Sequence, residues 1–141
     1  VDSLRLEKRF VAWGADINSD YTPIEAGLGF LIDWDKGDFL GRDALQRQKT
    51  IGPERKLAAL LLDDPLTVFG GEAVSHENTV VAQTTSGNFA YSLGHPIALA
   101  YLPSSLAHTG TKLTVQSFGE ICSAKVVMAT PFDPGREKIL C

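Results

Sequence analysis

The amino-acid sequence predicts a mainly β protein, α+β at its start, whose second part closes into a small β-barrel. Charge is unevenly spread: the first 64 residues carry 9 of the 13 Lys and Arg and 12 of the 17 Asp and Glu. Long helices need charged outer faces, whereas short strands can expose Thr, Ser and Gln instead. After residue 56, short apolar runs alternate with turn residues. Five or six strands at this spacing favour a barrel, because closure removes exposed edges.

The first fifty residues are predicted to contain short helices and one strand. A helix is expected over Asp2–Trp13. A second helix start is expected at Thr22, which can cap a helix and is followed by Pro23 in the first turn. The apolar run Gly29–Trp34 indicates a strand. Another helix is predicted over Gly41–Lys49, where acidic and basic residues are placed to suit the helix dipole.

A linker is predicted over residues 51–56, where Gly52 and Pro53 interrupt the helical pattern, so that residues 57–141 form the barrel. Its strands are expected at Leu57–Leu62, Val80–Thr84, Ile97–Leu102, Lys112–Phe118 and Ile121–Ala129. Connecting turns are expected at Asp63–Pro65, Gly70–Gly71, Ser86–Asn88 and Pro103–Ser105, with a tight hairpin at Gly119–Glu120.

Composition excludes several classes of protein. With 44% hydrophobic and 21% charged residues, the chain can bury a core and is not disordered. A net charge of −4 disfavours nucleic-acid binding, and no apolar run approaches the roughly 20 residues that span a membrane. For the two cysteines, Cys122 and Cys141, free thiols in a reducing compartment are favoured over a disulfide. The start at Val1 resembles neither a signal peptide nor an initiator methionine, so we expect a piece of a longer protein.

The sequence contains no self-contained reaction centre. Gly27–Gly29 begins like a dinucleotide fingerprint, but Ile32 takes the place of the third glycine. The three histidines lie too far apart for a local metal motif, and Ser86 is not in a nucleophile elbow. A structural ion pair is favoured over a ligand contact for Arg5, and core or interface packing for Trp13. We therefore assign no catalytic residue and no metal ligand, and predict that the chain alone is inactive.

Seven strings that occur in order are more specific than any periodicity. They are Asp2–Lys8, Ala12–Ile17, Thr22–Phe30, Lys36–Leu45, Thr84–Gly87, Ile97–Tyr101 and Pro131–Pro134. Together they resemble the carboxy-terminal part of the glycine-cleavage T-protein (aminomethyltransferase) family. The string at residues 36–45 looks like the subgroup fused to flavin-dependent dimethylglycine and sarcosine dehydrogenases. The resemblance covers essentially the whole chain.

This resemblance implies a fold and a cofactor. Residues 1–50 would be the last segment of a folate-binding domain, and residues 57–141 the carboxy-terminal barrel. Tetrahydrofolate would accept a one-carbon unit, and in the dehydrogenase subgroup FAD on an upstream domain would oxidise the N-methyl amine. The family's catalytic aspartate and pterin-binding glutamate would precede Val1, which itself stands where aminomethyltransferases have an arginine for the folate tail. Residues near the folate would be Arg5, Trp13 and Glu25.

Three functions stay open at this point. The chain could belong to an oxidative N-demethylase of dimethylglycine or sarcosine, to a non-catalytic regulator similar to the regulatory subunit of pyruvate dehydrogenase phosphatase, or to a stand-alone aminomethyltransferase. The turn Asp35–Asp38 favours the first two. Folate and an N-methyl amine are the expected partners, and the exposed apolar positions of residues 1–50 are expected to support self-association. The resemblance implies the bacterial cytoplasm or the mitochondrial matrix.

Overall fold

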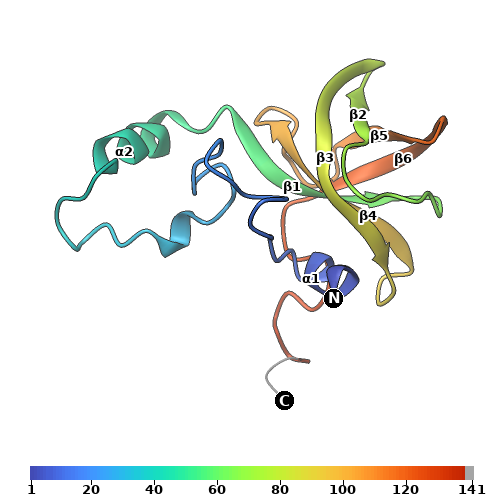
Figure 1. Cartoon of the computed structure of the whole chain (residues 1–141), viewed down its shortest axis with the longest axis horizontal. Coiled ribbons are helices and arrows are strands. Elements are labelled where there is room, and N and C mark those ends of the chain that lie inside the picture. Colours follow the sequence, from blue (N-terminus) through green and yellow to red (C-terminus); the bar gives the residue numbers. More distant parts are fainter. Residues whose placement is uncertain (139–141) are drawn as a thin grey trace.

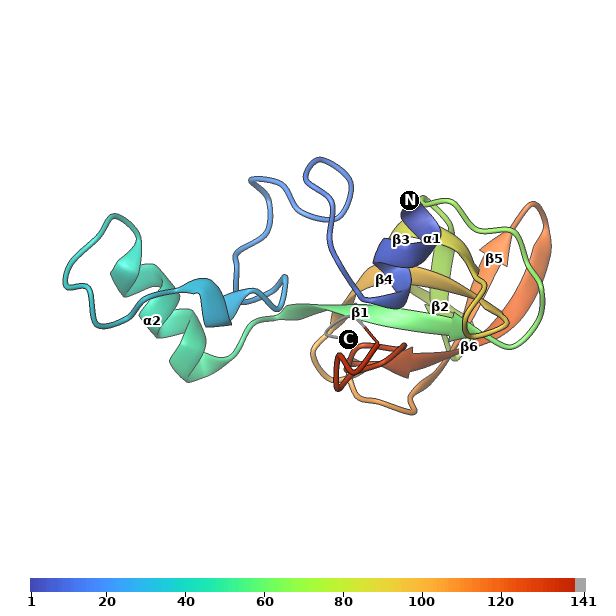
Figure 2. The same ribbon diagram turned by 90° about the horizontal axis from the view of Figure 1, so that it is seen from below.

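The computed structural model describes residues 1–138, in which a six-stranded barrel carries a short helix on its surface and a helical arm that extends away from it (Figures 1 and 2). The strands are all antiparallel and close in the order β1-β4-β3-β2-β5-β6, so the expected mainly β fold with a small barrel is confirmed. Their bounds are β1 (Arg55–Leu62), β2 (Ala73–His76), β3 (Thr79–Ala90), β4 (His95–Pro103), β5 (Lys112–Ser117) and β6 (Glu120–Val127).

The barrel has a core on its inside and a second cluster on its outside. Strands β5 and β6 alternate between buried and exposed residues, as expected for strands with one solvated face. Strands β1 and β4 are buried on both faces, and their sequences are accordingly almost continuously apolar. Leu60 of β1 points into the interior cluster, whereas the neighbouring Leu57 and Ala59 belong to the outer cluster.

Residues 1–28 cover this outer face. Helix α1 (Asp2–Glu7) packs against β3 and β4, and its Leu6 is completely buried in the outer cluster. Partly buried side chains from the following loops extend the same cover: Val11, Ile17, Tyr21 and Leu28. Helix α2 (Arg42–Ile51) has no buried residue, and residues 52–54 separate it from β1. The division at residues 51–56 stays a prediction.

The expected helix over Asp2–Trp13 is wrong beyond Glu7. At Arg9 the backbone adopts a φ of +56°, which ends the helical path. This conformation turns the guanidinium of Arg9 inward, where it donates hydrogen bonds to the carbonyl oxygens of Leu57 and Met128. Burial of that guanidinium lowers the pKa of Arg9. These tertiary contacts with Leu57 near the start of β1 and with Met128 just after β6 therefore override the helical pattern.

Two other predictions in the first fifty residues are also wrong. The segment Gly29–Trp34 is not a strand but contains the 3₁₀ helix η1 (Gly29–Leu31), because among the described residues no strand lies beside it to supply hydrogen bonds. The helix expected at Thr22 makes a single turn. The amides of Gly27 and Leu28 donate to carbonyls three and five residues back, and Gly27 has a φ of +74°, which is a Schellman-type stop.

The predicted turn at Ser86–Asn88 lies instead inside β3, next to a β-bulge. Gly87 allows β3 to pack closely against Val68, because a Cβ at this position would come within 2.8 Å of the Val68 side chain. The hairpin between β5 and β6 is confirmed, but its two loop residues are Phe118 and Gly119, both at positive φ.

The segment after β6 returns to α1 and fastens it. Lys8 Nζ lies 2.6 Å from Asp133 Oδ2 and 2.9 Å from the Asp133 carbonyl oxygen. The amide of Phe132 donates to the carbonyl oxygen of Glu7 at 3.0 Å. We call Glu7, Lys8, Phe132 and Asp133 the C-terminal clasp. Of the cysteines, Cys122 is buried and free, and Cys141 lies outside the described residues.

Acid is expected to open the C-terminal clasp. Lys8 donates a hydrogen bond that holds the pKa of Asp133 below its ordinary value, with further lowering by the amides of Lys138 and Glu137. A carboxylate with a depressed folded pKa stabilises the fold above its unfolded pKa, and this contribution is lost as the pH falls through the folded pKa. NMR of the Phe132 amide between about pH 5 and pH 2 should report the opening. An unchanged profile in Asp133→Asn would contradict this cause.

Candidate functional site

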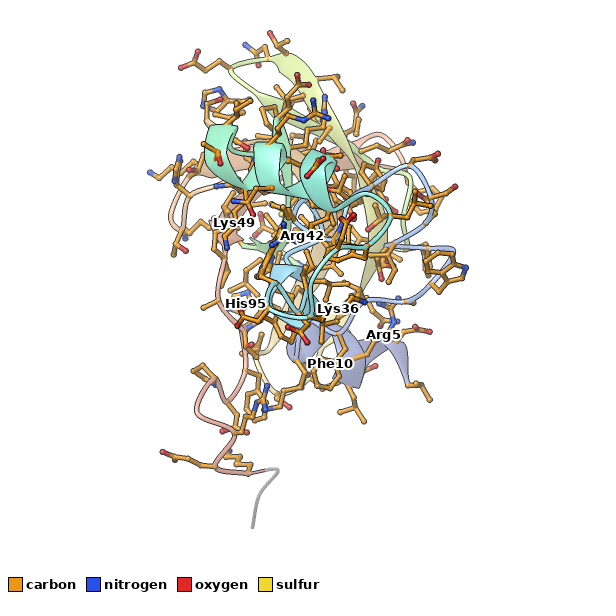
Figure 3. The ribbon with its side chains drawn as sticks, turned by 90° about the vertical axis from the view of Figure 1, so that its left-hand side faces the viewer. Arg5, Phe10, Lys36, Arg42, Lys49 and His95 are labelled. Carbon is orange, nitrogen blue, oxygen red and sulfur yellow. The ribbon has the colours of Figure 1, made fainter. Side chains whose placement is uncertain are left out.

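A charged network joins α1 to β3 on the outer face of the barrel. The guanidinium of Arg5 contacts two carboxylates, with Nε 2.8 Å from Asp2 Oδ1 and Nη1 2.8 Å from Asp16 Oδ2. Its Nη2 donates to Ser86 Oγ of β3 at 3.0 Å. Nη1 also donates to the carbonyl oxygen of Phe10 at 3.2 Å, and Figure 3 shows Arg5 and Phe10 next to each other. The expectation that Arg5 makes a structural ion pair matches this geometry.

Asp16 is the centre of the network. Its side chain is completely buried and accepts hydrogen bonds from three donors: Arg5, the amide of Ala12 at 2.9 Å and Thr85 Oγ1 at 2.6 Å. Together these bonds fix the loop of residues 10–17 onto β3. Sequence analysis did not single out Asp16. The one signal that could have led to Asp16 was the ion pair expected for Arg5, because that pair needed an acidic partner.

Tyr101 of β4 also contacts the loop that contains Asp16. Its hydroxyl donates to the carbonyl oxygen of Asp16 at 3.0 Å, and its ring stacks on Tyr21 with centroids 3.6 Å apart and planes 5° apart. Burial raises the pKa of Tyr101, and the nearby Tyr21, Asp16 and Glu25 raise it further. The hydroxyl therefore stays protonated and remains a donor at neutral pH.

The three predicted folate-proximal residues lie in different surroundings. Arg5 is part of the charged network, and Trp13 lies in the loop held by Asp16 with 77% of its surface exposed. Glu25 is a local cap: its Oε2 accepts from the amide of Thr22 at 2.8 Å and from the Thr22 hydroxyl at 2.9 Å. The structure thus joins Arg5 to the loop of Trp13 through Asp16. Glu25 instead caps the turn that begins at Thr22.

The charged and aromatic residues of this region differ in what they could offer a ligand. The charge of Arg5 is paired with two carboxylates, whereas Glu25 accepts hydrogen bonds from Thr22 and makes no ion pair within the described residues. The aromatic side chains of Trp13, Phe10 and Phe30 are exposed. Within residues 1–138 there is no cluster of His, Cys, Asp and Glu that could hold a metal, and no helix with the length and apolar character needed to cross a bilayer.

Comparison with known proteins matches this chain to one family. Residues 55–133 match the glycine cleavage T-protein C-terminal barrel domain, and residues 1–36 match the GCVT N-terminal domain. The chain is 42% identical over 132 residues to the aminomethyltransferase of Rippkaea orientalis, covering 93% of this chain and 36% of that protein. It is 37% identical over 129 residues to the mitochondrial dimethylglycine dehydrogenase of Mus musculus, covering 90% of this chain and 15% of the dehydrogenase.

A solved structure agrees. The crystal structure of the glycine cleavage system aminomethyltransferase T from Bartonella henselae superposes with a TM-score of 0.84 at 29% identity, over 94% of this chain and 38% of the other. The chain spans about a third of the length of the aminomethyltransferases that it matches and a smaller share of the dehydrogenases.

Proposed function

Since this chain belongs to the glycine cleavage T-protein family, we propose that it is the carboxy-terminal module of a folate-dependent one-carbon enzyme. The observation that carries the proposal is the network of Arg5, Asp16 and Ser86. It fastens the segment that matches the GCVT N-terminal domain onto the barrel and holds the exposed Trp13 in place. Tetrahydrofolate, when bound, supplies the acceptor for the one-carbon unit. Trp13 would contribute aromatic surface to its site, and Arg5 and Asp16 would position Trp13.

For the substrate, we favour an oxidative N-demethylase of dimethylglycine or sarcosine, with FAD on a separate domain. The string Lys36–Leu45 and the 37% identity to dimethylglycine dehydrogenase support this assignment. The second candidate is an aminomethyltransferase, which the 42% identity to the Rippkaea orientalis protein favours. The two differ in colour and product, because only the first carries a flavin and releases a demethylated amine, its N-methyl carbon having been oxidised by the flavin and passed to tetrahydrofolate. We place either one in the bacterial cytoplasm or the mitochondrial matrix.

A chimera tests the proposed role. This chain replaces the matching 132 residues of the Rippkaea orientalis aminomethyltransferase, and binding of 5-formyltetrahydrofolate is measured by calorimetry. We expect the chimera to bind the folate, and the Arg5→Ala chimera to bind it more weakly because the Trp13 loop loses an anchor. The Asp2→Ala chimera is the matched control, since Asp2 contacts the same guanidinium from an exposed position. A folded chimera that does not bind the folate would refute the role.

By itself, the chain is expected to bind reduced folate weakly. Arg5 is already paired with two carboxylates, Glu25 accepts hydrogen bonds from Thr22, and the side chain of Val1 is uncharged, unlike the arginine that the family places there. Each missing charge-assisted contact costs about 1.5–3 kcal/mol, or one to two decades of affinity. Titration of the isolated chain with 5-formyltetrahydrofolate should give no saturation in the micromolar range. Micromolar binding would show that this module carries a complete pocket of its own.

The helical arm, which contains η1 and α2, is the surface that we propose for self-association of the isolated chain. Helix α2 has no buried residue, and both Ile51 at its end and Leu40 just before its start are largely exposed. A ten-residue helix is marginal in water by itself, and the contacts of α2 with Thr22 and Trp34 leave Ile51 exposed, so covering this residue is favourable. Sedimentation velocity over a range of concentrations tests this, and Leu40→Asn should shift the chain towards the monomer.

A further inference from the structure

Three large apolar side chains are exposed around the turn of the β5–β6 hairpin. Phe69 is 65%, Phe118 85% and Ile121 68% exposed. We call these three residues the tip patch. The hairpin lies at the end of the barrel opposite to α2 in both ribbon views (Figures 1 and 2). The tip patch is therefore remote from the arm.

Phe118 occupies a backbone position that disfavours it. It has a φ of +50° and Gly119 a φ of +86°, which is the conformation of a two-residue hairpin turn that usually selects Asn-Gly. A bulky side chain in the left-handed region costs stability. Within residues 1–138 nothing buries the ring in return. Contacts within the described residues therefore give no reason for an aromatic side chain at this position.

Acidic groups surround the tip patch. A hollow of about 460 Å³ lies between Phe69 and Phe118 and includes Glu72. A second hollow of about 420 Å³ lies beside Ile121, with Asp64 and Glu120 in its wall. Among the residues that the structure describes, no Lys or Arg lines either hollow.

Glu72 keeps its charge despite its partial burial. Burial alone would raise the pKa of Glu72, but hydrogen bonds from the amides of Phe69 and Gly70 and from the Thr84 hydroxyl lower it overall. The rim of the tip patch is therefore negative at neutral pH, and its centre is apolar.

We propose that the tip patch binds a protein segment in which an aromatic or aliphatic anchor is flanked by lysine or arginine. The anchor would enter the hollow between Phe69 and Phe118, and its basic neighbours would face Glu72 and Glu120. Exposed aromatic side chains are the usual anchors of protein interfaces, and opposite charges at the rim set partner choice and speed of association. The closed barrel offers no free strand edge here, so side chains carry the recognition.

NMR titration of the isotope-labelled chain with two short peptides tests the proposal. One peptide has a phenylalanine flanked by lysines, and the control has glutamates in place of the lysines. We expect saturable shifts at the amides of Phe69, Phe118 and Ile121 with the lysine peptide alone, weakening as salt is added. The Phe118→Asn variant keeps the turn, because Asn tolerates the left-handed region, and should bind about tenfold more weakly. Val80→Thr, an exposed site on β3, is the matched control and should bind normally.

Three outcomes would overturn the proposal. The first is the absence of saturable shifts at the tip patch. The second is equal binding of the glutamate peptide, which would reduce the patch to non-specific apolar adhesion. The third is unchanged binding by Phe118→Asn with the fold intact.

Discussion

Replacing Asp16 with alanine is expected to lower the free energy of unfolding by about 3 to 5 kcal/mol, the cost of removing one partner from a buried ion pair. The substitution removes the buried one of the two carboxylates that contact Arg5, and it leaves the amide of Ala12 and the hydroxyl of Thr85 without this acceptor. The Asp16 side chain is completely buried and that of Arg5 is 17% exposed, so water can restore little of this loss. The urea midpoint should fall without a change in the slope of the transition.

Asp2→Ala is the matched control for this experiment. Asp2 contacts the same guanidinium at the same distance of 2.8 Å, but 65% of its side chain is exposed. Exposed pairs contribute about 0 to 1 kcal/mol, so the Asp2 variant should unfold almost as the parent does. Asp16→Asn keeps an acceptor for Ala12 and should lie between the two. Equal losses in the Asp2 and Asp16 variants would show that burial does not decide the strength of this network.

The second large effect is expected for Gly87→Ala, which should cost about 3 kcal/mol of unfolding free energy, at the upper end for overpacking. An added Cβ would lie 2.8 Å from Val68 Cβ and Cγ2 and 2.9 Å from the Val68 backbone carbon. Val68 is 3% exposed and belongs to the interior cluster, so it has no room to move aside. Thermal and urea unfolding measure the loss.

The same substitution at Gly29 is a control for the loss of glycine itself. A Cβ at Gly29 would meet its nearest neighbour, Ile24, at an ordinary 3.9 Å, and the backbone there does not have a positive φ. Gly29→Ala should therefore be neutral or slightly stabilising. Adding Val68→Ala to Gly87→Ala should restore only part of the stability, because the contacts with Val68 Cβ and the backbone remain. Full recovery would place the clash in the valine methyl group alone.

Much of the barrel could be predicted from the sequence because its strands are short, apolar and bounded by turn residues. Strand β2 was missed because it has four residues and buries only Val74. Ser86–Asn88 has the composition of a turn, although it lies inside β3 next to a β-bulge. Gly87 is needed there because Val68, from another segment of the chain, leaves no room for a Cβ atom. A local pattern cannot distinguish a glycine that makes a turn from one that makes room for a neighbour.

The site shows a similar limit. Arg5 could be singled out and its structural pairing anticipated, but Asp16 lies 11 residues away and Ser86 lies 81 residues away. No helical or strand periodicity relates these positions; docking of α1 onto β3 brings them together. Trp13 and Glu25 could be selected by resemblance alone. The exposure of Trp13 and the capping bond of Glu25 depend on a loop whose path tertiary contacts determine.

The place of β1 in the barrel has a consequence for the newly made chain. Strand β1 pairs with β4 and β6, and β4 begins at His95, 33 residues after β1 ends at Leu62. At a synthesis rate of about 5–20 residues per second, the apolar stretch Leu57–Leu62 waits about 2 to 7 seconds on the ribosome before its first partner strand begins to appear. Unpaired apolar strands of this length are prone to aggregate. Residues 1–28 are made earlier, but α1 packs against β3 and β4, so their docking onto the outer face has to wait for the same strands. Slow translation between β1 and β4 would thus reduce the yield of folded protein without altering the finished barrel.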